Sequence, residues 1–167
     1  VEGLAAMEPV ADANVLYAFH FYDPWEYTTY RVNRRRFAYP ARMPSPSGRC
    51  DASDMRRDAA RVAEWAKQDA IPMNRIVAAE IGVDRRVGGA AEYLEDLVRV
   101  LNEHGWHWAF YSYREDNWDG MDYELGDGKP NAAYWEAIEA GRMPGPESYT
   151  PNPIFDVIKN YLCLPQK

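Results

Sequence analysis

The feature of this sequence that most constrains its fold is an alternation of strand-length apolar runs with amphipathic helices. The apolar runs occupy residues 14–20, 75–83 and 106–112, and helical patterns separate them at residues 53–66 and 90–104. Each run ends in or beside polar and aromatic residues. Strands that alternate with helices in this way predict βα units and a parallel sheet.

Local signals support the helices. Ser53 is a suitable N-cap for the first of them. The second has Leu94, Leu97, Val98 and Leu101 on one face and Gly105 placed for a left-handed C-terminal cap. Two further helices are predicted over residues 131–140 and 153–163, the latter capped by Asn152, and residues 21–50 are predicted to form a long structured loop.

The middle apolar run delivers one carboxylate, Glu80, near its end and just before a glycine. Buried parallel strands are apolar, and α/β folds build their sites at the carboxyl ends of the strands, so an acid there indicates a functional residue. From this stretch alone, the alternative is that Glu80 lies in a solvated loop or pairs with Arg85 or Arg86.

Composition narrows the function classes. The 167 residues are one domain's worth, and 26 acidic against 19 basic side chains leave a formal charge of -7, which argues against nucleic acid as a partner. Tryptophan, tyrosine and phenylalanine make up 14% of the chain, and such planar rings stack on sugars. The longest apolar runs are too short to span a bilayer, so no membrane partner is expected.

Neither the compartment nor any cofactor is indicated. No secretory leader is recognised in this chain, and a secreted location is left open. Cys50 and Cys163 allow either one disulfide or two free thiols. No metal site is predicted, because the acidic residues at positions 116, 119 and 122 lack the EF-hand spacing and the three histidines form no zinc pattern. No glycine-rich nucleotide loop follows any strand, which argues against a dinucleotide-binding fold.

Three ordered segments resemble the last three βα units of glycoside hydrolase family 5, the cellulase-type TIM barrels. They are His20-Phe21-Tyr22-Asp23-Pro24 after the first apolar run, Ala79-Glu80-Ile81-Gly82-Val83, and Gly105 to Arg114 followed by Trp118-Asp119-Gly120. The resemblance implies an α/β fold, a partial, half-barrel-like (β/α)8 TIM barrel with about three parallel strands and flanking helices. Residues 1–167 would then be a single domain, the C-terminal portion of such a barrel.

The resemblance also implies roles for particular residues. Glu80 would be the nucleophile of a retaining endo-β-1,4-glucanase, and His20 and Tyr22 would contact the substrate and the nucleophile. The aromatic platform of the eighth strand would be Tyr111 or Trp118. The expected substrate is a β-linked glucan or a related polysaccharide.

The sequence departs from the family pattern in its missing general acid. Family members carry Asn-Glu-Pro after the fourth strand, whereas Met7-Glu8-Pro9 resembles it in letters only and does not end an apolar strand. Three strands also leave two open edges, so we expect a homo-oligomer or a complementing barrel half that covers them and supplies the acid. The alternative is a catalytically silent carbohydrate-binding or structural remnant that has lost the acid.

Overall fold

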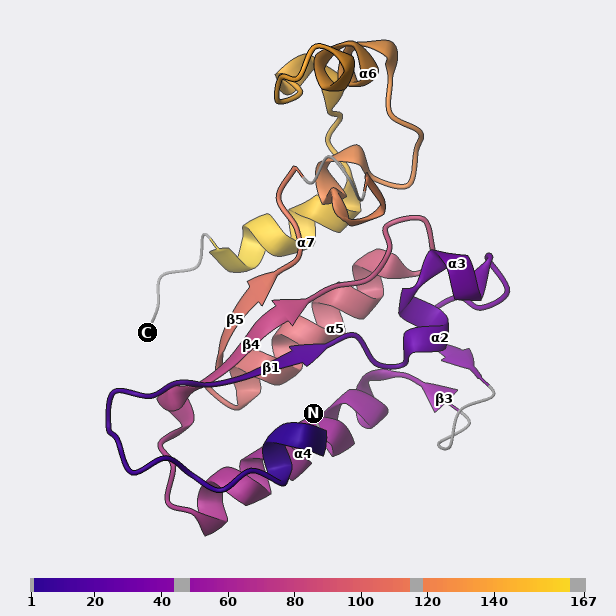
Figure 1. Ribbon diagram of the computed structural model, residues 1–167. Coiled ribbons are helices and arrows are strands. Elements are labelled where there is room, and N and C mark those ends of the chain that lie inside the picture. The colour runs from indigo at the N-terminus through magenta and orange to yellow at the C-terminus, as the bar shows by residue number, and fades with distance from the viewer. Residues whose placement is uncertain (1, 44–48, 115–118, 163–167) are drawn as a thin grey trace.

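The protein is built around an open sheet of three parallel strands. A computed structural model describes residues 2–43, 49–114 and 119–162. The strands β1 (Tyr17–Phe21), β4 (Ile76–Ile81) and β5 (His107–Phe110) lie in the order β1-β4-β5 (Figure 1). Neighbouring strands of this sheet are also successive in the βα order, and each connection between them contains one long helix. The predicted α/β fold with about three parallel strands and flanking helices is confirmed.

Two long helices connect these strands. Helix α4 (Ala52–Gln68) joins β1 to β4, and α5 (Ala90–Glu103) joins β4 to β5. Right-handed crossovers between successive parallel strands place their helices on one face of the sheet, and α4 and α5 pack against each other. The side chains of β1 follow this arrangement, since Tyr17, Phe19 and Phe21 are buried in the core while Ala18 and His20 are exposed.

The start of α4 differs from the prediction. The N-cap is Asp51 and not Ser53, because the Asp51 carboxylate accepts a hydrogen bond of 2.9 Å from the Ser53 N–H. The Asp54 side chain in turn accepts from the Asp51 N–H at 3.3 Å, which completes a capping box. Because Asp51 caps the helix, Ser53 is already a residue within it.

The other predicted helices are confirmed with small shifts of their ends. Helix α6 spans Ala132–Glu139 and α7 spans Pro153–Leu162, with the Asn152 side chain accepting the Phe155 N–H at 3.1 Å. Gly105, just beyond α5, has a φ of +69°, as the left-handed cap requires. Helix α7 packs along α5 and extends the helical layer.

The segment between β1 and α4 is more regular than the predicted loop. It holds the short helices α2 (Trp25–Thr28) and α3 (Tyr30–Asn33) and an antiparallel pair of β2 (Ala41–Arg42) and β3 (Arg49–Cys50). The buried Asn33 organises it, because its amide donates to the carbonyls of Tyr27 and Phe37 at 3.0 and 3.1 Å. Side-chain bonding to the backbone of this kind is not visible as periodicity in a sequence.

The remaining elements are short. They are α1 (Glu2–Ala5) and the 3-10 turns η1 (Met73–Arg75), η2 (Asp119–Met121), η3 (Tyr123–Leu125) and η4 (Pro146–Ser148). Helix α6 lies beyond the carboxyl ends of the strands, at the far end of the molecule from α4 (Figure 1).

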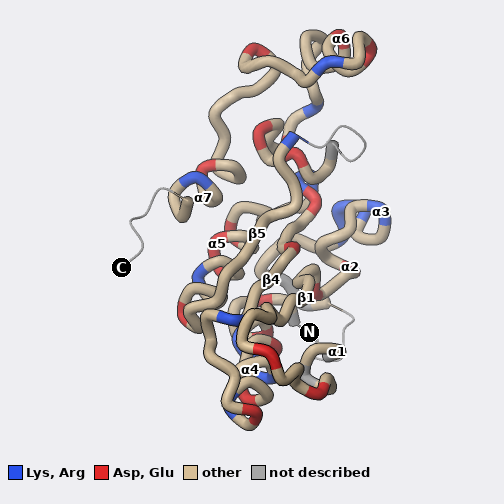
Figure 2. Tube along the Cα trace, turned by 60° about the vertical axis from the view of Figure 1, so that its left-hand side comes forward, with Lys and Arg blue, Asp and Glu red and all other residues tan. Residues whose placement is uncertain are grey.

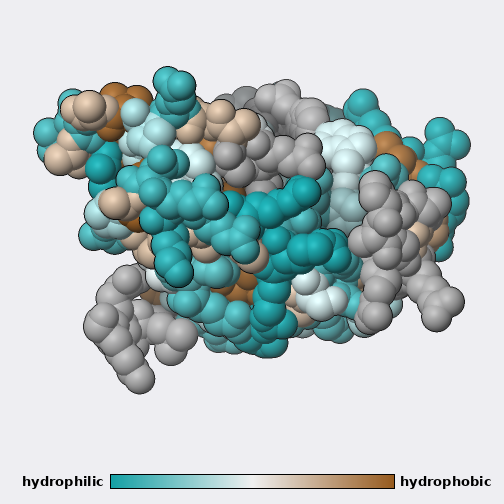
Figure 3. Space-filling view, turned by 90° about the horizontal axis from the view of Figure 1, so that it is seen from below, coloured by the Kyte–Doolittle hydropathy of each residue, from teal (hydrophilic) through white to brown (hydrophobic). Residues whose placement is uncertain are grey.

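The surface is polar and its charges are unevenly spread. The face in Figure 3 is mainly hydrophilic with scattered apolar residues. Basic residues gather at α3 and the turn after it (Figure 2). The guanidinium groups of Arg34 and Arg36 donate there to backbone carbonyls, consistent with the solvated face that such a run usually forms.

Neither a membrane helix nor a disulfide is found in the described part of the chain. Its helices are all too short or too polar to cross a bilayer. Cys50 is a buried free thiol, and burial raises its pKa to about 12, whereas Cys163 lies outside the described residues.

Candidate functional site

Glu80 reaches the open face of the sheet through an irregularity in β4. Phe19 pairs with Ala78 and His20 pairs with Glu80, so β4 holds one residue more than β1 at this point. In strict alternation after the buried Ile76 and Ala78, position 80 would face the helices. The additional residue reverses the alternation of inward and outward side chains in β4, so that Glu80 lies beside the exposed His20. Bulges beside active sites commonly re-aim a side chain in this way.

Two side chains from the end of β1 contact the Glu80 carboxylate. The Tyr22 hydroxyl donates to Oε2 at 2.9 Å, and Nδ1 of His20 lies 3.4 Å from the same oxygen. The Glu80 side chain keeps 38% of its surface exposed. The carboxylate is therefore fixed on one oxygen and still open to solvent, which is the arrangement that a nucleophile requires.

The environment of Tyr22 keeps its phenol protonated, so that the hydroxyl remains a hydrogen-bond donor. Its pKa lies far above the ordinary phenol value, first because burial disfavours the phenolate and second because it donates to the Glu80 carboxylate. The phenol of Tyr111 also contributes to this rise. The Tyr111 backbone lies at the end of β4, because its N–H donates to the carbonyl of Ile81, the residue after Glu80. The structure thus brings together His20, Tyr22, Glu80 and Tyr111 at one edge of the sheet.

The arginines after β4 have other contacts. The guanidinium of Arg86 donates twice to Asp84, at 2.8 and 2.6 Å, and lies over the Tyr30 ring. Arg85 is 1% exposed and donates from Nη1 to the carbonyls of Gly126 and Gly128. These contacts replace the ion pair with Glu80 that the sequence left open.

The end of β5 meets the end of β4 at Gly82. The Tyr111 N–H donates to the Ile81 carbonyl at 2.8 Å, and a Cβ on Gly82 would lie 2.9 Å from the Tyr111 carbonyl oxygen. A glycine therefore permits the approach that brings Tyr111 to the site. The peptide bond between Tyr111 and Ser112 is cis. Trp118, the other candidate for the platform, lies outside the described residues.

Glu8 lies at the opposite end of the sheet. Val10, two residues further on, bonds through its N–H to the hydroxyl of Tyr17, which begins β1, and the Met7 carbonyl accepts from Trp65. Glu80 is near the carboxyl end of its strand, so Glu8 does not reach it within one chain. The resemblance of Met7-Glu8-Pro9 to a catalytic motif is confined to its letters.

The described residues contain no group of three or more potential metal ligands. His107 lies at the start of β5, where its Nε2 is 3.0 Å from the Asn74 carbonyl, and His104 stacks on Trp106. Burial lowers the pKa of His104. Asp122 is buried as well, and it accepts the Glu124 N–H at 3.1 Å.

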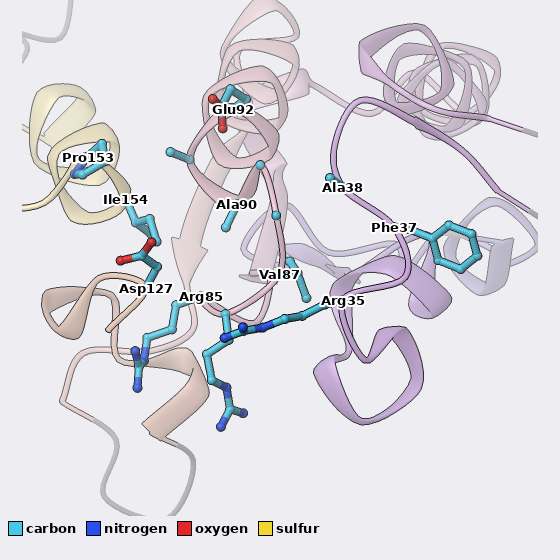
Figure 4. A pocket seen from close by; sticks show the side chains of 14 residues that line it. Arg35, Phe37, Ala38, Arg85, Val87, Ala90, Glu92, Asp127, Pro153 and Ile154 are labelled. Atoms are coloured by element: carbon cyan, nitrogen blue, oxygen red, sulfur yellow. The ribbon is translucent and has the colours of Figure 1, made fainter. Parts of the chain in front are cut away.

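A cavity of about 510 Å³ lies beyond β4, between the turn after α3 and the first residues of α5 and α7. Figure 4 shows Arg35, Arg85, Asp127 and Glu92 among its lining side chains. Both basic and acidic side chains therefore line the cavity.

Two residues important to the site were not singled out by sequence reasoning. Thr28 and Tyr93 bond to the backbone of the turn that carries Tyr22, at 2.6 and 2.8 Å. Thr28 lay in the predicted loop and Tyr93 in a helix, and neither position has a local signal for this role.

The comparisons with known proteins concern the family and the fold. The model of the family "Cellulase (glycosyl hydrolase family 5)" matches residues 1–117. An endoglucanase structure matches 67% of this chain and 36% of its own, with a TM-score of 0.52 and 20% identity. Endoglucanase Cel5A from the hyperthermophilic Thermotoga maritima matches 64% of this chain and 34% of its own, with a TM-score of 0.51 and 19% identity.

A third solved structure, cellulose synthase subunit Z from Clostridioides difficile, gives a TM-score of 0.50 at 14% identity over 64% of this chain and 36% of its own. No curated protein sequence matches. The chain spans about a third of the length of these structures. At such identities the likeness establishes the fold, a part of a (β/α)8 barrel.

Proposed function

This chain belongs to glycosyl hydrolase family 5, the cellulase family, and on that premise we propose that Glu80 is the nucleophile of a retaining β-glycoside hydrolysis. The observation that carries the proposal is the hydrogen bond of 2.9 Å from Tyr22 to Glu80 on an otherwise open carboxylate. The proposed substrate is a β-linked glucan, as the family name "Cellulase" suggests.

The two carboxylate oxygens of Glu80 differ in their contacts. Tyr22 and His20 both lie at Oε2, so Oε1 is the oxygen that attacks the anomeric carbon. Formation of the glycosyl ester breaks the glycosidic bond and sends its electron pair to the leaving oxygen, which takes a proton from a general acid. Water activated by the same group then releases the sugar with its configuration retained.

The sugar would bind across the carboxyl ends of the strands. Tyr111 is half-buried at the end of β5, and its N–H bonds to the carbonyl of Ile81 next to Glu80, so its ring is proposed as the platform for a pyranose. Trp118 is proposed as a second stacking residue from its position in the sequence alone. His20, whose side chain is 56% exposed, would donate to a sugar hydroxyl from the same edge.

The general acid is proposed to come from outside this segment. A retaining mechanism requires two carboxyl groups about 5–5.5 Å apart. Within the described residues, the recorded side-chain contacts of Glu80 are those with Tyr22 and His20, and Glu8 lies at the other end of the sheet. A second copy of the chain, or a complementing half of the barrel, would cover the open face of the sheet and bring the missing carboxyl.

Turnover of an activated substrate tests the proposal. With 2,4-dinitrophenyl β-cellobioside, whose leaving group needs little protonation, we expect wild-type turnover and a loss of at least a thousandfold in Glu80→Gln. Carboxymethyl-cellulose, which needs the acid, should be hydrolysed far more slowly than this substrate. Glu92→Gln is the matched control, because Glu92 is an exposed acid on α5, and it should keep wild-type turnover.

The same assay distinguishes the alternative function. If the wild-type protein hydrolyses neither substrate but binds cello-oligosaccharides in a titration, the chain is a silent carbohydrate-binding remnant and Glu80 is not a nucleophile. Equal turnover by wild type and Glu80→Gln would also refute the assignment of Glu80.

A further inference from the structure

The turn that carries Tyr22 has all three of its backbone carbonyls held by donors. The carbonyl of Tyr22 accepts from Thr28 Oγ1 at 2.6 Å, and that of Asp23 accepts from the Tyr93 hydroxyl at 2.8 Å. The Pro24 carbonyl accepts the N–H groups of Tyr27 and Thr28 at 2.9 and 3.1 Å. A surface turn with every acceptor satisfied by the protein is more restrained than one that bonds to water.

Thr28 also connects this turn to the loop after Glu80. Its own carbonyl accepts the Asp84 N–H at 2.8 Å, and Asp84 follows Glu80 by four residues. Thr28 is only 4% exposed, so water does not compete well for its hydroxyl or its carbonyl. A single buried residue thus contacts both segments whose separation decides whether Tyr22 reaches Glu80.

Tyr93 restrains the same turn from helix α5. It is fully buried in α5 beside Tyr27 and Tyr39, with ring centroids 5.4 and 5.6 Å away. Burial raises its pKa well above the ordinary value, so the hydroxyl stays protonated and continues to donate. The Asp23 carbonyl is therefore anchored to the helical layer behind the sheet.

We propose that Thr28 is a positioning residue for the Tyr22–Glu80 pair: its hydroxyl fixes the Tyr22 backbone so that the phenol lies within hydrogen-bond reach of Glu80 Oε2. This inference rests on the proposed role of Glu80 for its catalytic consequence but not for its geometry. Thr28 touches no reacting atom. It acts through Tyr22, and Tyr93 supports the neighbouring carbonyl.

The geometric claim is tested by NMR of the protein labelled with ¹³Cζ-tyrosine. The Tyr22 resonance is assigned from its absence in Tyr22→Phe, and Glu80→Gln gives its position when the carboxylate acceptor is lost. We expect Thr28→Val, which keeps the shape but removes the hydroxyl, to move the Tyr22 resonance at least half of the way to the Glu80→Gln position. Thr28→Ser, which restores the hydroxyl, should return it to the wild-type position.

The catalytic consequence is tested with 2,4-dinitrophenyl β-cellobioside. Thr28→Val should lower kcat about tenfold with KM within twofold, because an interaction of the reacting carboxylate is disturbed and sugar binding is not. In a Tyr22→Phe background the same substitution should cost less than twofold further, since the phenol through which Thr28 acts is gone.

The results separate this inference from the proposed function. An unchanged Tyr22 resonance in a folded Thr28→Val overturns the inference, as do kinetic losses that multiply in the double variant. If wild type shows no turnover while the resonance moves as expected, the proposed function fails and the positioning role stands. Should Thr28→Val not fold, Tyr93→Phe removes the hydroxyl that holds the Asp23 carbonyl of the same turn and must move the same resonance.

Discussion

Tyr22 keeps its proton over the neutral and mildly alkaline range, because burial and the Glu80 carboxylate both raise the pKa of its phenol. The bond to Glu80 Oε2 therefore does not change with pH in that range. A loss of turnover on the alkaline side would report on the group that supplies the leaving-group proton, and not on Tyr22.

Asp122 is the residue whose ionisation should affect stability most clearly. Burial, aided by the nearby Glu124, raises its pKa from 3.8 to about 6, against the opposing effects of the Glu124 N–H, Arg85 and Tyr149. The folded state thus binds a proton more tightly than the unfolded state. The free energy of unfolding should fall as pH rises from about 4 to about 6, by at most about 3 kcal/mol, and then level off.

Urea unfolding at pH 4 and pH 7 tests this prediction. Asp122→Asn keeps an acceptor for the Glu124 N–H and cannot ionise, so it should lose less stability than wild type between the two pH values. The exposed Asp127→Asn should behave as wild type. A pH dependence in Asp122→Asn that parallels that of wild type would contradict the assignment.

At the scale of residues, the sequence predicted the side chains that form the candidate site. It did not predict the side chains that bond to the backbone beside Tyr22. The motif order indicated His20, Tyr22 and Glu80, and the structure places their side chains together. Thr28 and Tyr93 bond to carbonyls six and 70 positions away, and a hydroxyl's partner at such distances follows from tertiary structure. The pairing of Arg86 with Asp84 rather than with Glu80 is instead local, since the two residues are two positions apart.

At the scale of elements, the junction of β4 and β5 depends on Gly82. A Cβ at this position would lie 2.6 Å from Met121 Cε, 2.8 Å from the Tyr123 hydroxyl and 2.9 Å from the Tyr111 carbonyl oxygen. Met121 can move aside, but the carbonyl belongs to the backbone. The glycine thus sets how closely the two strand ends approach.

Gly82→Ala should destabilise the protein by about 1–3 kcal/mol, the usual cost of overpacking, and should also lower turnover because Tyr111 is displaced. Gly128→Ala is the control, since its nearest neighbour would be the Leu125 carbonyl at 3.9 Å, and it should change stability by less than about 0.5 kcal/mol. Urea unfolding and turnover of 2,4-dinitrophenyl β-cellobioside measure the two effects. Wild-type behaviour of Gly82→Ala in both assays would refute the steric argument.

The elements with strong periodicity were the ones that the sequence predicted well. The apolar face of α5 and its terminal Gly105 gave a helix that ends within a residue of the prediction. The first strand was placed at residues 14–20, whereas β1 is Tyr17–Phe21, because an apolar run alone does not determine where pairing begins. The irregularity of β4 that changes the direction of the Glu80 side chain arises from pairing with β1. Neither strand has a sequence pattern that would have predicted it.

At the scale of the whole molecule, the sheet has one covered and one open face. The exposed residues Ala18 and His20 on β1 and His107 and Ala109 on β5 belong to the open side. Strands β1 and β5 are also the two edges of the sheet, and unpaired edges favour association. The matched part of this chain corresponds to only about a third of each matched structure, so most of a (β/α)8 barrel lies outside these 167 residues.

Light scattering coupled to size exclusion tests this proposal for a second copy. We expect a mass that is a multiple of that of one chain, with a dimer or larger assembly dissociating on dilution. A stable monomer that retains turnover would contradict the need for association. A monomer without turnover on carboxymethyl-cellulose would instead require the complementing barrel half as the partner.

The most direct test of the central claim is to trap the covalent intermediate on Glu80. The reagent 2,4-dinitrophenyl 2-deoxy-2-fluoro-β-cellobioside has a leaving group that needs no acid and a fluorine that slows release, so the glycosyl ester accumulates. We predict one sugar per chain in the tryptic peptide of residues 76–85, bound at Glu80, and no label in Glu80→Gln. A label on another carboxylate, or none on a folded wild-type protein of the assembled mass, would contradict the account.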